Sequence, residues 1–187
     1  MVTPDLITSL EQYGADFSLE RHVSEKIIDF IQKYGEFAFV KENLEWHITA
    51  TLLITNPEKI KVLLMLHKKY QIWTPFGGHS DGDTNPRSVA IREFHEESGI
   101  DLEPVGIGNI FSLQIWEVAE RTSSSGMFQP AHEHYDILYL AMIPEDTPFY
   151  REESEVDDIR WFDIVGIEKY IGETRMLDMI SKIQHFS

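Results

Sequence analysis

The spacing of apolar residues along the chain predicts two helices at its start. Apolar residues recur at helical intervals in residues 4–13, and Gly14 is expected to end that helix. A second helix is expected to begin at Ser18 and to end at Gly35, with an isoleucine-rich stripe along one side. We expect this helical extension, residues 1–44, to pack on the rest of the chain, and its surface is a candidate homodimer interface.

Segments rich in β-branched residues predict a sheet in the middle of the chain. The expected strands are residues 46–55, 60–67, 71–75, 106–118, 133–142 and 158–162, of which 106–118 is one long or broken strand. A polar loop is expected over residues 119–131, and an amphipathic helix with an interruption near Gly172 is expected over residues 164–183. Because no linker or internal repeat separates these elements, we expect one domain, residues 1–187, with an α/β architecture.

A further helix between the strands is predicted by its own start and stop residues. Asn85 can accept a hydrogen bond from a free backbone amide, and Pro86 needs no amide partner in the first helical turn. Gly99 is expected to end the helix after about three turns. Ala90 and Phe94 fall on one side of it and would hold it against a core.

Three carboxylates on this helix form an arrangement that local physics opposes. Glu93, Glu96 and Glu97 stand at positions i, i+3 and i+4, so they share one face. They crowd like charges toward the helix C-terminus, where the helix dipole is already negative. Such a conflict is typical of a functional site, and Mg²⁺ or Mn²⁺ would resolve it because these ions prefer oxygen ligands. The alternative interpretation is a solvated acidic face.

The segment around this helix, residues 78–100, resembles the Nudix box. That pattern opens with a glycine, and its second half reads Arg-Glu-apolar-any-Glu-Glu-any-Gly-apolar. The residues in register are Gly78, Arg92, Glu93, Phe94, Glu96, Glu97, Gly99 and Ile100. Thr84 departs from the pattern, because a glutamate belongs there, and Asp81 or Asp83 beside it is a candidate replacement.

The resemblance implies an α/β/α sandwich with a mixed sheet and the activity of a Nudix hydrolase. It implies metal-dependent hydrolysis of a diphosphate bond in a nucleoside diphosphate linked to another moiety, with Mg²⁺ or Mn²⁺ as the cofactor. The implied metal ligands are Glu93, Glu96, Glu97 and the carbonyl group of Gly77. The implied catalytic residues are Glu93, which would orient or deprotonate water, and Arg92, which would hold Glu93 in place.

Three histidines form a second group, which this function does not require. Period-two alternation places His132, His134 and Asp136 on one face of the expected later strand, and His79 directly follows the paired glycines. The motifs GGHxDGD and HxHxD resemble those of a largely uncharacterised Nudix subgroup. Converging histidines can bind a transition metal or donate hydrogen bonds to phosphates. We predict that His79, His132 and His134 contact substrate rather than metal, as would Trp73; histidines satisfied by their neighbours are the alternative.

Charge and composition narrow the expected partners. The chain of 187 residues carries 16 basic and 32 acidic residues, a net charge of −16. Such a chain repels nucleic acid and anionic membranes, so the expected partner is a small-molecule diphosphate whose charge is screened by metal ions. No apolar run approaches the roughly 20 residues of a membrane span. The absence of cysteine fits the reducing cytoplasm, where we expect the protein to be located.

Two other functions stay open. A catalytically silent Nudix fold could serve as a ligand-binding sensor, which Thr84 favours and the three glutamates of the box oppose. An enzyme similar to isoprenoid diphosphate isomerase is the second alternative, although that chemistry typically calls on a cysteine and this chain has none. Within a hydrolase, Glu152, Glu153 and Glu155 are candidates for a further metal ligand or a general base, or they form a solvated acidic loop.

Overall fold

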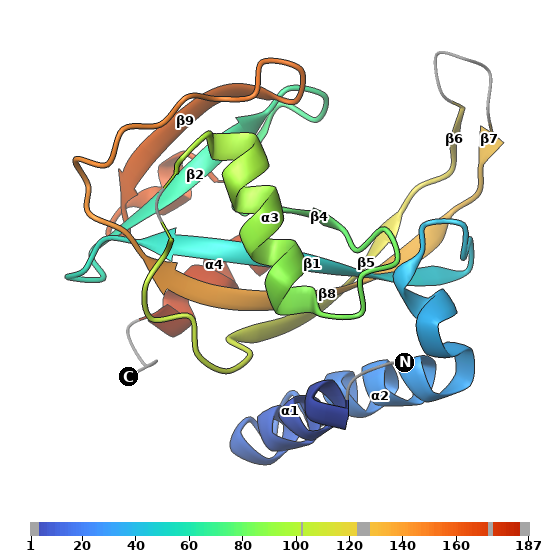
Figure 1. The fold of residues 1–187 in the computed structure, drawn as a ribbon. Helices are drawn as coiled ribbons and strands as arrows, with labels where there is room; N and C mark the ends of the chain where they lie inside the picture. Colours follow the sequence, from blue (N-terminus) through green and yellow to red (C-terminus); the bar gives the residue numbers. More distant parts are fainter. Residues whose placement is uncertain (1–3, 102, 123–127, 172–173, 184–187) are drawn as a thin grey trace.

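The computed structural model describes residues 4–101, 103–122, 128–171 and 174–183. Its centre is a seven-stranded sheet in the order β3-β2-β1-β8-β5, in which β4 also pairs with β1 and β9 with β2 (Figure 1). These strands are β1 (Trp46–Thr55), β2 (Lys61–His67), β3 (Ile72–Thr74), β4 (Phe76–His79), β5 (Ser112–Val118), β8 (His132–Met142) and β9 (Val156–Asp163). The pair β1–β8 is parallel and the other pairs of the sheet are antiparallel, so the sheet is mixed.

Alternation along β1 decides which helix covers which face of the sheet. Ala50 and Leu52 are buried in one core cluster with Phe94 of α3 (Pro86–Ser98). Leu53, which points the other way, is buried in a second cluster with apolar residues of α4 (Thr174–Lys182). Figure 1 shows α3 crossing one face of the sheet and α4 behind it. This arrangement confirms the predicted α/β/α sandwich with a mixed sheet.

The first two helices, α1 (Pro4–Asp16) and α2 (Arg21–Tyr34), lie side by side near one end of the sheet (Figure 1). A short 3₁₀ helix, Gly35–Phe39, follows α2 and leads to β1. Buried residues of both helices belong to the core cluster that also contains α3. The two helices therefore cover the same face of the sheet as α3.

Two predicted helix boundaries in this extension are wrong. The first helix passes through Gly14 and ends at Asp16, because contact with α2 supports its last turn: Arg21 Nε donates to the carbonyl of Gly14 at 3.2 Å. The second helix begins at Arg21 rather than Ser18, since a turn comes first in which the Glu20 amide donates to the carbonyl of Phe17.

The segment 106–118, expected as one long or broken strand, is broken. It is regular only from Ser112, because Gly106 adopts a φ of 78° and Val105 beside it forms a single isolated bridge to Met142. The expected loop 119–131 contains two short paired strands, β6 (Arg121–Thr122) and β7 (Phe128–Gln129), and its tip lies outside the described residues. The C-terminal segment forms a 3₁₀ turn, Ile167–Lys169, and α4, and the interruption predicted near Gly172 lies outside the described residues. Within the described residues, no helix is long and apolar enough to span a membrane.

Candidate active site

The helix α3 begins and ends at the residues that the sequence predicts. The Asn85 side chain accepts a hydrogen bond from the Ser88 amide at 3.4 Å, and Pro86 occupies the first turn. Gly99 ends the helix in the left-handed conformation, with a φ of 62°. A Cβ atom there would lie 2.1 Å from the carbonyl oxygen of Tyr150, so no other residue fits without a shift of the backbone.

Glu97 is the most deeply buried of the three carboxylates, with 5% of its surface exposed. Its Oε2 atom accepts a hydrogen bond from the Gly77 amide at 2.9 Å, which fixes the carboxylate against β4. Burial raises the pKa of Glu97 to about 8; the hydrogen bond from Gly77 opposes this shift, and the charge of Glu93 adds to it. Without a cation nearby, the carboxylate is costly to ionise at neutral pH.

The carboxylate of Glu93 occupies the space that a side chain at position 78 would fill. A Cβ atom at Gly78 would lie 2.7–2.9 Å from the carboxylate atoms of Glu93. Arg92 contacts the same carboxylate, with 2.9 Å between Nη1 and Oε1. Burial raises the pKa of Glu93 to about 6, even though the charge of Arg92 lowers it. The value suits a group that takes up and releases protons near neutral pH.

Glu96 is the exposed member of the three, with 58% of its side chain accessible. It lies 3.3 Å from Nη1 of Arg92, whose Nη2 atom also donates to the carbonyl oxygen of His79 at 3.1 Å. Arg92 therefore joins two of the carboxylates on α3 to the end of β4. The structure brings together all three predicted glutamates, Arg92 and the two glycines of β4.

The two aspartates beside Thr84 are engaged with other groups. Asp81 lies 3.2 Å from the ammonium group of Lys41, and its backbone has a φ of 46°. The side chain of Asp83 accepts a hydrogen bond from the Asn85 amide at 2.9 Å and so supports the start of α3. Asp81 is nevertheless close enough for its charge to contribute to the raised pKa of Glu93. Replacement of the missing glutamate by either aspartate stays a prediction.

The acidic connection before β9 runs past the C-terminal end of α3. The Glu152 amide donates to the carbonyl of Glu97 at 3.2 Å, and the Tyr150 amide donates to the carbonyl of Ser98 at 2.8 Å. Among the three glutamates of this loop, Glu155 is the one whose charge raises the pKa of both Glu93 and Glu97. It is therefore a candidate fourth carboxylate of the site.

The donor set fits a hard divalent cation. It consists of the carboxylates of Glu93, Glu96 and Glu97, whose oxygens Mg²⁺ and Mn²⁺ prefer; the Gly77 carbonyl as a further ligand stays a prediction. The raised pKa values of Glu93 and Glu97 show that the fold holds two acids where an additional positive charge would stabilise their ionised forms.

The predicted histidines lie together on the face of the sheet opposite α3. His47, which was not predicted as a site residue, lies among them. His47 of β1 lies beside His134, with 4.4 Å between the ring centres, and 5.1 Å from His132. The ring of His79 lies 5.2 Å from that of His134. His47 occupies the same strand face as Thr49, but only the non-local pairing of β1 with β8 brings it to His134, and a single sequence does not contain that information.

Trp73 lies in another part of the sheet. Its ring contacts Phe162 at 4.7 Å and lies 5.3 Å from the guanidinium group of Arg160. By contrast, the ring of Trp116 on β5 contacts His134 at 4.4 Å, and the guanidinium group of Arg175 on α4 lies 4.7 Å from the centre of that ring. Contact of Trp73 with substrate stays a prediction.

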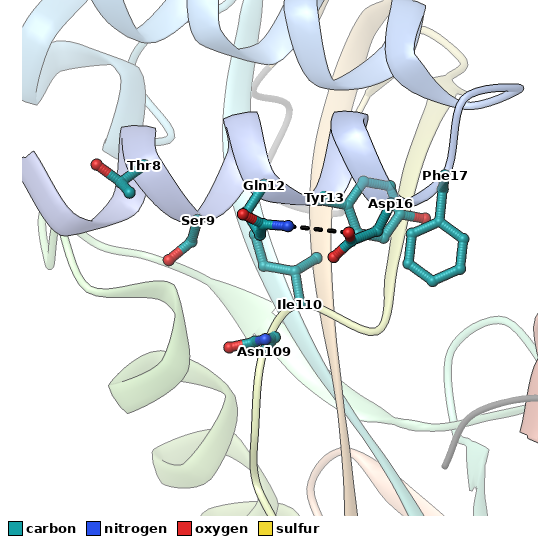
Figure 2. A pocket seen from close by; sticks show the side chains of 8 residues that line it. All are labelled: Thr8, Ser9, Gln12, Tyr13, Asp16, Phe17, Asn109 and Ile110. Atoms are coloured by element: carbon teal, nitrogen blue, oxygen red, sulfur yellow. Dashed lines mark hydrogen bonds between the residues drawn. The ribbon is translucent and has the colours of Figure 1, made fainter.

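A hollow of about 300 Å³ lies between α1 and the loop at Asn109 and Ile110 (Figure 2). The polar groups in it include Gln12, which donates to Asp16 at 2.9 Å. None of its lining residues belongs to the box or to the histidine group. We therefore assign it no part in the chemistry of α3.

Comparison with known proteins identifies the family. The NUDIX domain model matches residues 45–181, which is most of the chain. The chain therefore belongs to the NUDIX domain family, and the predicted Nudix hydrolase is confirmed. A curated relative, the "Probable DHNTP pyrophosphohydrolase" of Lactococcus lactis subsp. cremoris, is 23% identical over 158 residues, covering 84% of this chain and 86% of the relative.

Solved structures show the same fold. A NUDIX family hydrolase from Clostridium perfringens is 23% identical with a TM-score of 0.55, covering 74% of this chain and 96% of that chain. The MutT protein from Methanosarcina mazei Go1 is 18% identical with a TM-score of 0.58, covering 75% and 94%. At these identities the likeness concerns the fold alone.

Proposed function

We propose that the protein is a metal-dependent hydrolase that cleaves a diphosphate bond in a nucleoside diphosphate linked to another moiety. The observation that carries the proposal is the pair of buried carboxylates on α3, Glu93 and Glu97, each held by a specific partner and each with a raised pKa. The name of the Lactococcus lactis relative, a probable pyrophosphohydrolase, supports cleavage of a pyrophosphate bond.

The carboxylates of Glu93, Glu96 and Glu97 and the carbonyl of Gly77 are the groups that would hold Mg²⁺ or Mn²⁺. When bound, the cation would neutralise part of the diphosphate charge and make a water molecule more acidic. The protein's own contribution is to fix the positions of these ligands. The Gly77 amide anchors Glu97, while Arg92 and the side-chain-free space at Gly78 position Glu93.

Glu93 is the proposed general base. It would accept a proton from water as the water oxygen bonds to phosphorus, and the bond between that phosphorus and the bridging oxygen breaks. A pKa of about 6 leaves Glu93 largely ionised at pH 7 and still basic enough to accept the proton. Arg92 keeps the Glu93 carboxylate oriented, and the charges of Glu96, Glu155 and Asp81 raise the pKa of Glu93.

His79 stays a proposed substrate contact: its carbonyl accepts from Arg92, which joins it to the site, while its ring lies on the face of β4 opposite Glu93. A neutral imidazole can donate one hydrogen bond to a phosphate oxygen. His132 and His134, predicted in the same role, lie buried behind it, with 5% and 6% exposure.

A substrate screen tests the proposal. The purified protein would be incubated with nucleotide sugars, dinucleoside polyphosphates, nucleoside triphosphates and non-nucleotide diphosphates, with Mg²⁺ or Mn²⁺ and with excess chelator. We expect release of a phosphorylated product from at least one class, and loss of that activity on chelation and in Glu97→Gln. Binding of a compound without turnover in any metal condition would instead support the sensor alternative.

A further inference from the structure

We propose that His47, His132 and His134 form a second metal site, for a transition-metal ion such as Zn²⁺, on the face of the sheet that α4 covers. The site is separate from the carboxylates of α3 and does not depend on the proposed hydrolytic function. Three protein ligands would leave a fourth tetrahedral position, bordered by His79, for water or another small ligand.

Strand pairing brings these side chains together. His47 and His134 are direct partners in the parallel pair β1–β8, so their side chains leave the same face of the sheet. His132 lies two residues before His134 on that face, and His79 faces the same side from β4, opposite Thr49. One ring nitrogen from each of His47, His132 and His134 lies within 4.8 Å of those from the other two.

The orientation of two of the rings is that of metal-bound histidines. The Nδ1 atom of His47 lies 3.1 Å from the carbonyl oxygen of Asn43, and the Nδ1 atom of His132 lies 2.9 Å from that of Pro130. A carbonyl oxygen can only accept, so both rings carry their proton on Nδ1 and have a lone pair on Nε2. Metal ligands are typically fixed in this way, by a backbone carbonyl that holds the other ring nitrogen.

His47 supplies a second, independent observation. Its side chain is buried, with 1% exposure, and within the described residues its Nε2 atom has no hydrogen-bond partner. A buried acceptor left unsatisfied is unfavourable, so such atoms are rare. A metal ion would satisfy this atom.

The spacing suits a small ion. The Nε2 atoms of His132 and His134 lie 3.1 Å apart. Two nitrogens bound to Zn²⁺ at tetrahedral angles lie roughly 3.3 Å apart, because each Zn–N bond is about 2.0–2.1 Å long. In the neutral pair, the shared proton belongs to His134, since His132 already holds its proton on Nδ1. Metal binding therefore requires His134 to move this proton to Nδ1 or to release it.

Titration with Co²⁺, which serves as a coloured probe, tests the site. Metal-free protein would be titrated in excess Mg²⁺, so that the carboxylates of α3 do not compete. We expect one tightly bound Co²⁺ per chain with the intense visible band of a site with four or five ligands. His47→Ala removes a direct ligand and is expected to weaken binding by about a hundredfold or more, since changes to outer-shell partners alone cost 10- to 100-fold.

Two control variants show whether the bound ion lies at these histidines. His22→Ala, at an exposed histidine of α2, is expected to bind Co²⁺ like the wild type, and Glu97→Gln is expected to retain the coloured site. Equal affinity of His47→Ala and wild type, or loss of the site in Glu97→Gln, would overturn the proposal. If His47→Ala fails to fold, the wild type can be tested by nuclear magnetic resonance. Addition of Zn²⁺ is expected to shift the imidazole nitrogen resonances of these three histidines, and unchanged resonances would refute the site.

Discussion

Two adjacent positions of β4 face opposite sides of the sheet, and a chemically different group of side chains lies on each side. A side chain at Gly78 would meet the carboxylate of Glu93, on the face that α3 covers. His79 points to the other face, where its ring lies among those of His47 and His134. One short strand therefore borders an oxygen-rich group on one side and a nitrogen-rich group on the other.

Burial has opposite consequences for the two groups. It favours the neutral form in both cases, so the pKa of Glu93 and Glu97 rises while the pKa of His47 falls. A neutral histidine is ready to bind a metal ion, whereas a neutral carboxylic acid must first lose its proton. Glu97 is therefore the carboxylate of α3 that needs a nearby cation to be ionised at neutral pH, whereas His47 is already in the neutral form that binds a metal ion.

The largest expected effect is on turnover when Glu93 loses its charge. Glu93→Gln keeps the shape of the side chain and is expected to lower kcat/KM about 10³-fold, within the range for removal of a general base. Glu96→Gln is expected to cost less, because Glu96 is exposed and its substitution leaves Glu93 and Glu97 in place. Steady-state kinetics of both variants would show the order, with Glu25→Gln on the exposed side of α2 as the control. A larger loss in Glu96→Gln would contradict the assignment of Glu93.

Gly78→Ala tests whether the position of Glu93 matters as well as its charge. The added Cβ atom would lie 2.7–2.9 Å from the Glu93 carboxylate, the movable end of a side chain, so we expect the fold to survive and Glu93 to be displaced. A displacement of this size is expected to lower kcat about 10²-fold. Gly108→Ala is the matched control, because the nearest atom to its Cβ would be 3.9 Å away. Equal kcat values for the two variants, with unchanged circular dichroism, would show that the position of Glu93 is not critical.

Stability measurements test the cost of burying Glu97. The folded pKa of about 8 lies above the unfolded value of 4.5, so the cost is absent below pH 4.5, grows as the pH rises, and is complete above about pH 8. Glu97→Gln removes it and is expected to raise the free energy of unfolding by about 2–4 kcal/mol at pH 8 in chelator. Urea denaturation at pH 8 and at pH 4.5 would measure this. An equal difference between variant and wild type at both pH values would contradict the raised pKa.

The sequence predicted the carboxylate group more completely than the histidine group, for a physical reason. Glu93, Glu96 and Glu97 lie within one helix, whose start at Asn85 and end at Gly99 are local features. His47 and His134 come together only through the pairing of strands far apart in the chain. A single sequence carries the first kind of information and not the second.

The same distinction applies to the fold. The strands β1 and β8 were predicted nearly to their ends, because β1 is rich in apolar and β-branched residues and β8 carries an apolar run over residues 137–142. The boundary at Gly14 was wrong, because the last turn of α1 is supported by α2, where Arg21 donates to the Gly14 carbonyl, and this is a tertiary contact. Local composition therefore predicted the elements, while helix packing decided where some of them end.

The smallest expected effect is that of restoring the family pattern. Thr84→Glu places a carboxylate at the box position where a glutamate belongs, near the start of α3. We expect a few-fold tighter Mn²⁺ binding, since one added ligand at a partly exposed position contributes about 1 kcal/mol or less. Calorimetric titration of Mn²⁺ into variant and wild type would show it. Weaker binding in the variant would indicate that the surroundings of Thr84 are arranged for a neutral residue.

The most direct test of the hydrolytic centre is to measure Mn²⁺ binding and turnover on the same preparations of wild type, Glu97→Gln and the control Glu25→Gln. Glu97 is buried and anchored by the Gly77 amide, so its substitution changes the charge of the site more than its shape. We expect wild type and Glu25→Gln to bind the ion and hydrolyse the substrate found by screening, and Glu97→Gln to lose both properties together. Wild-type turnover in Glu97→Gln, with or without bound Mn²⁺, would contradict the assignment of the active site to α3.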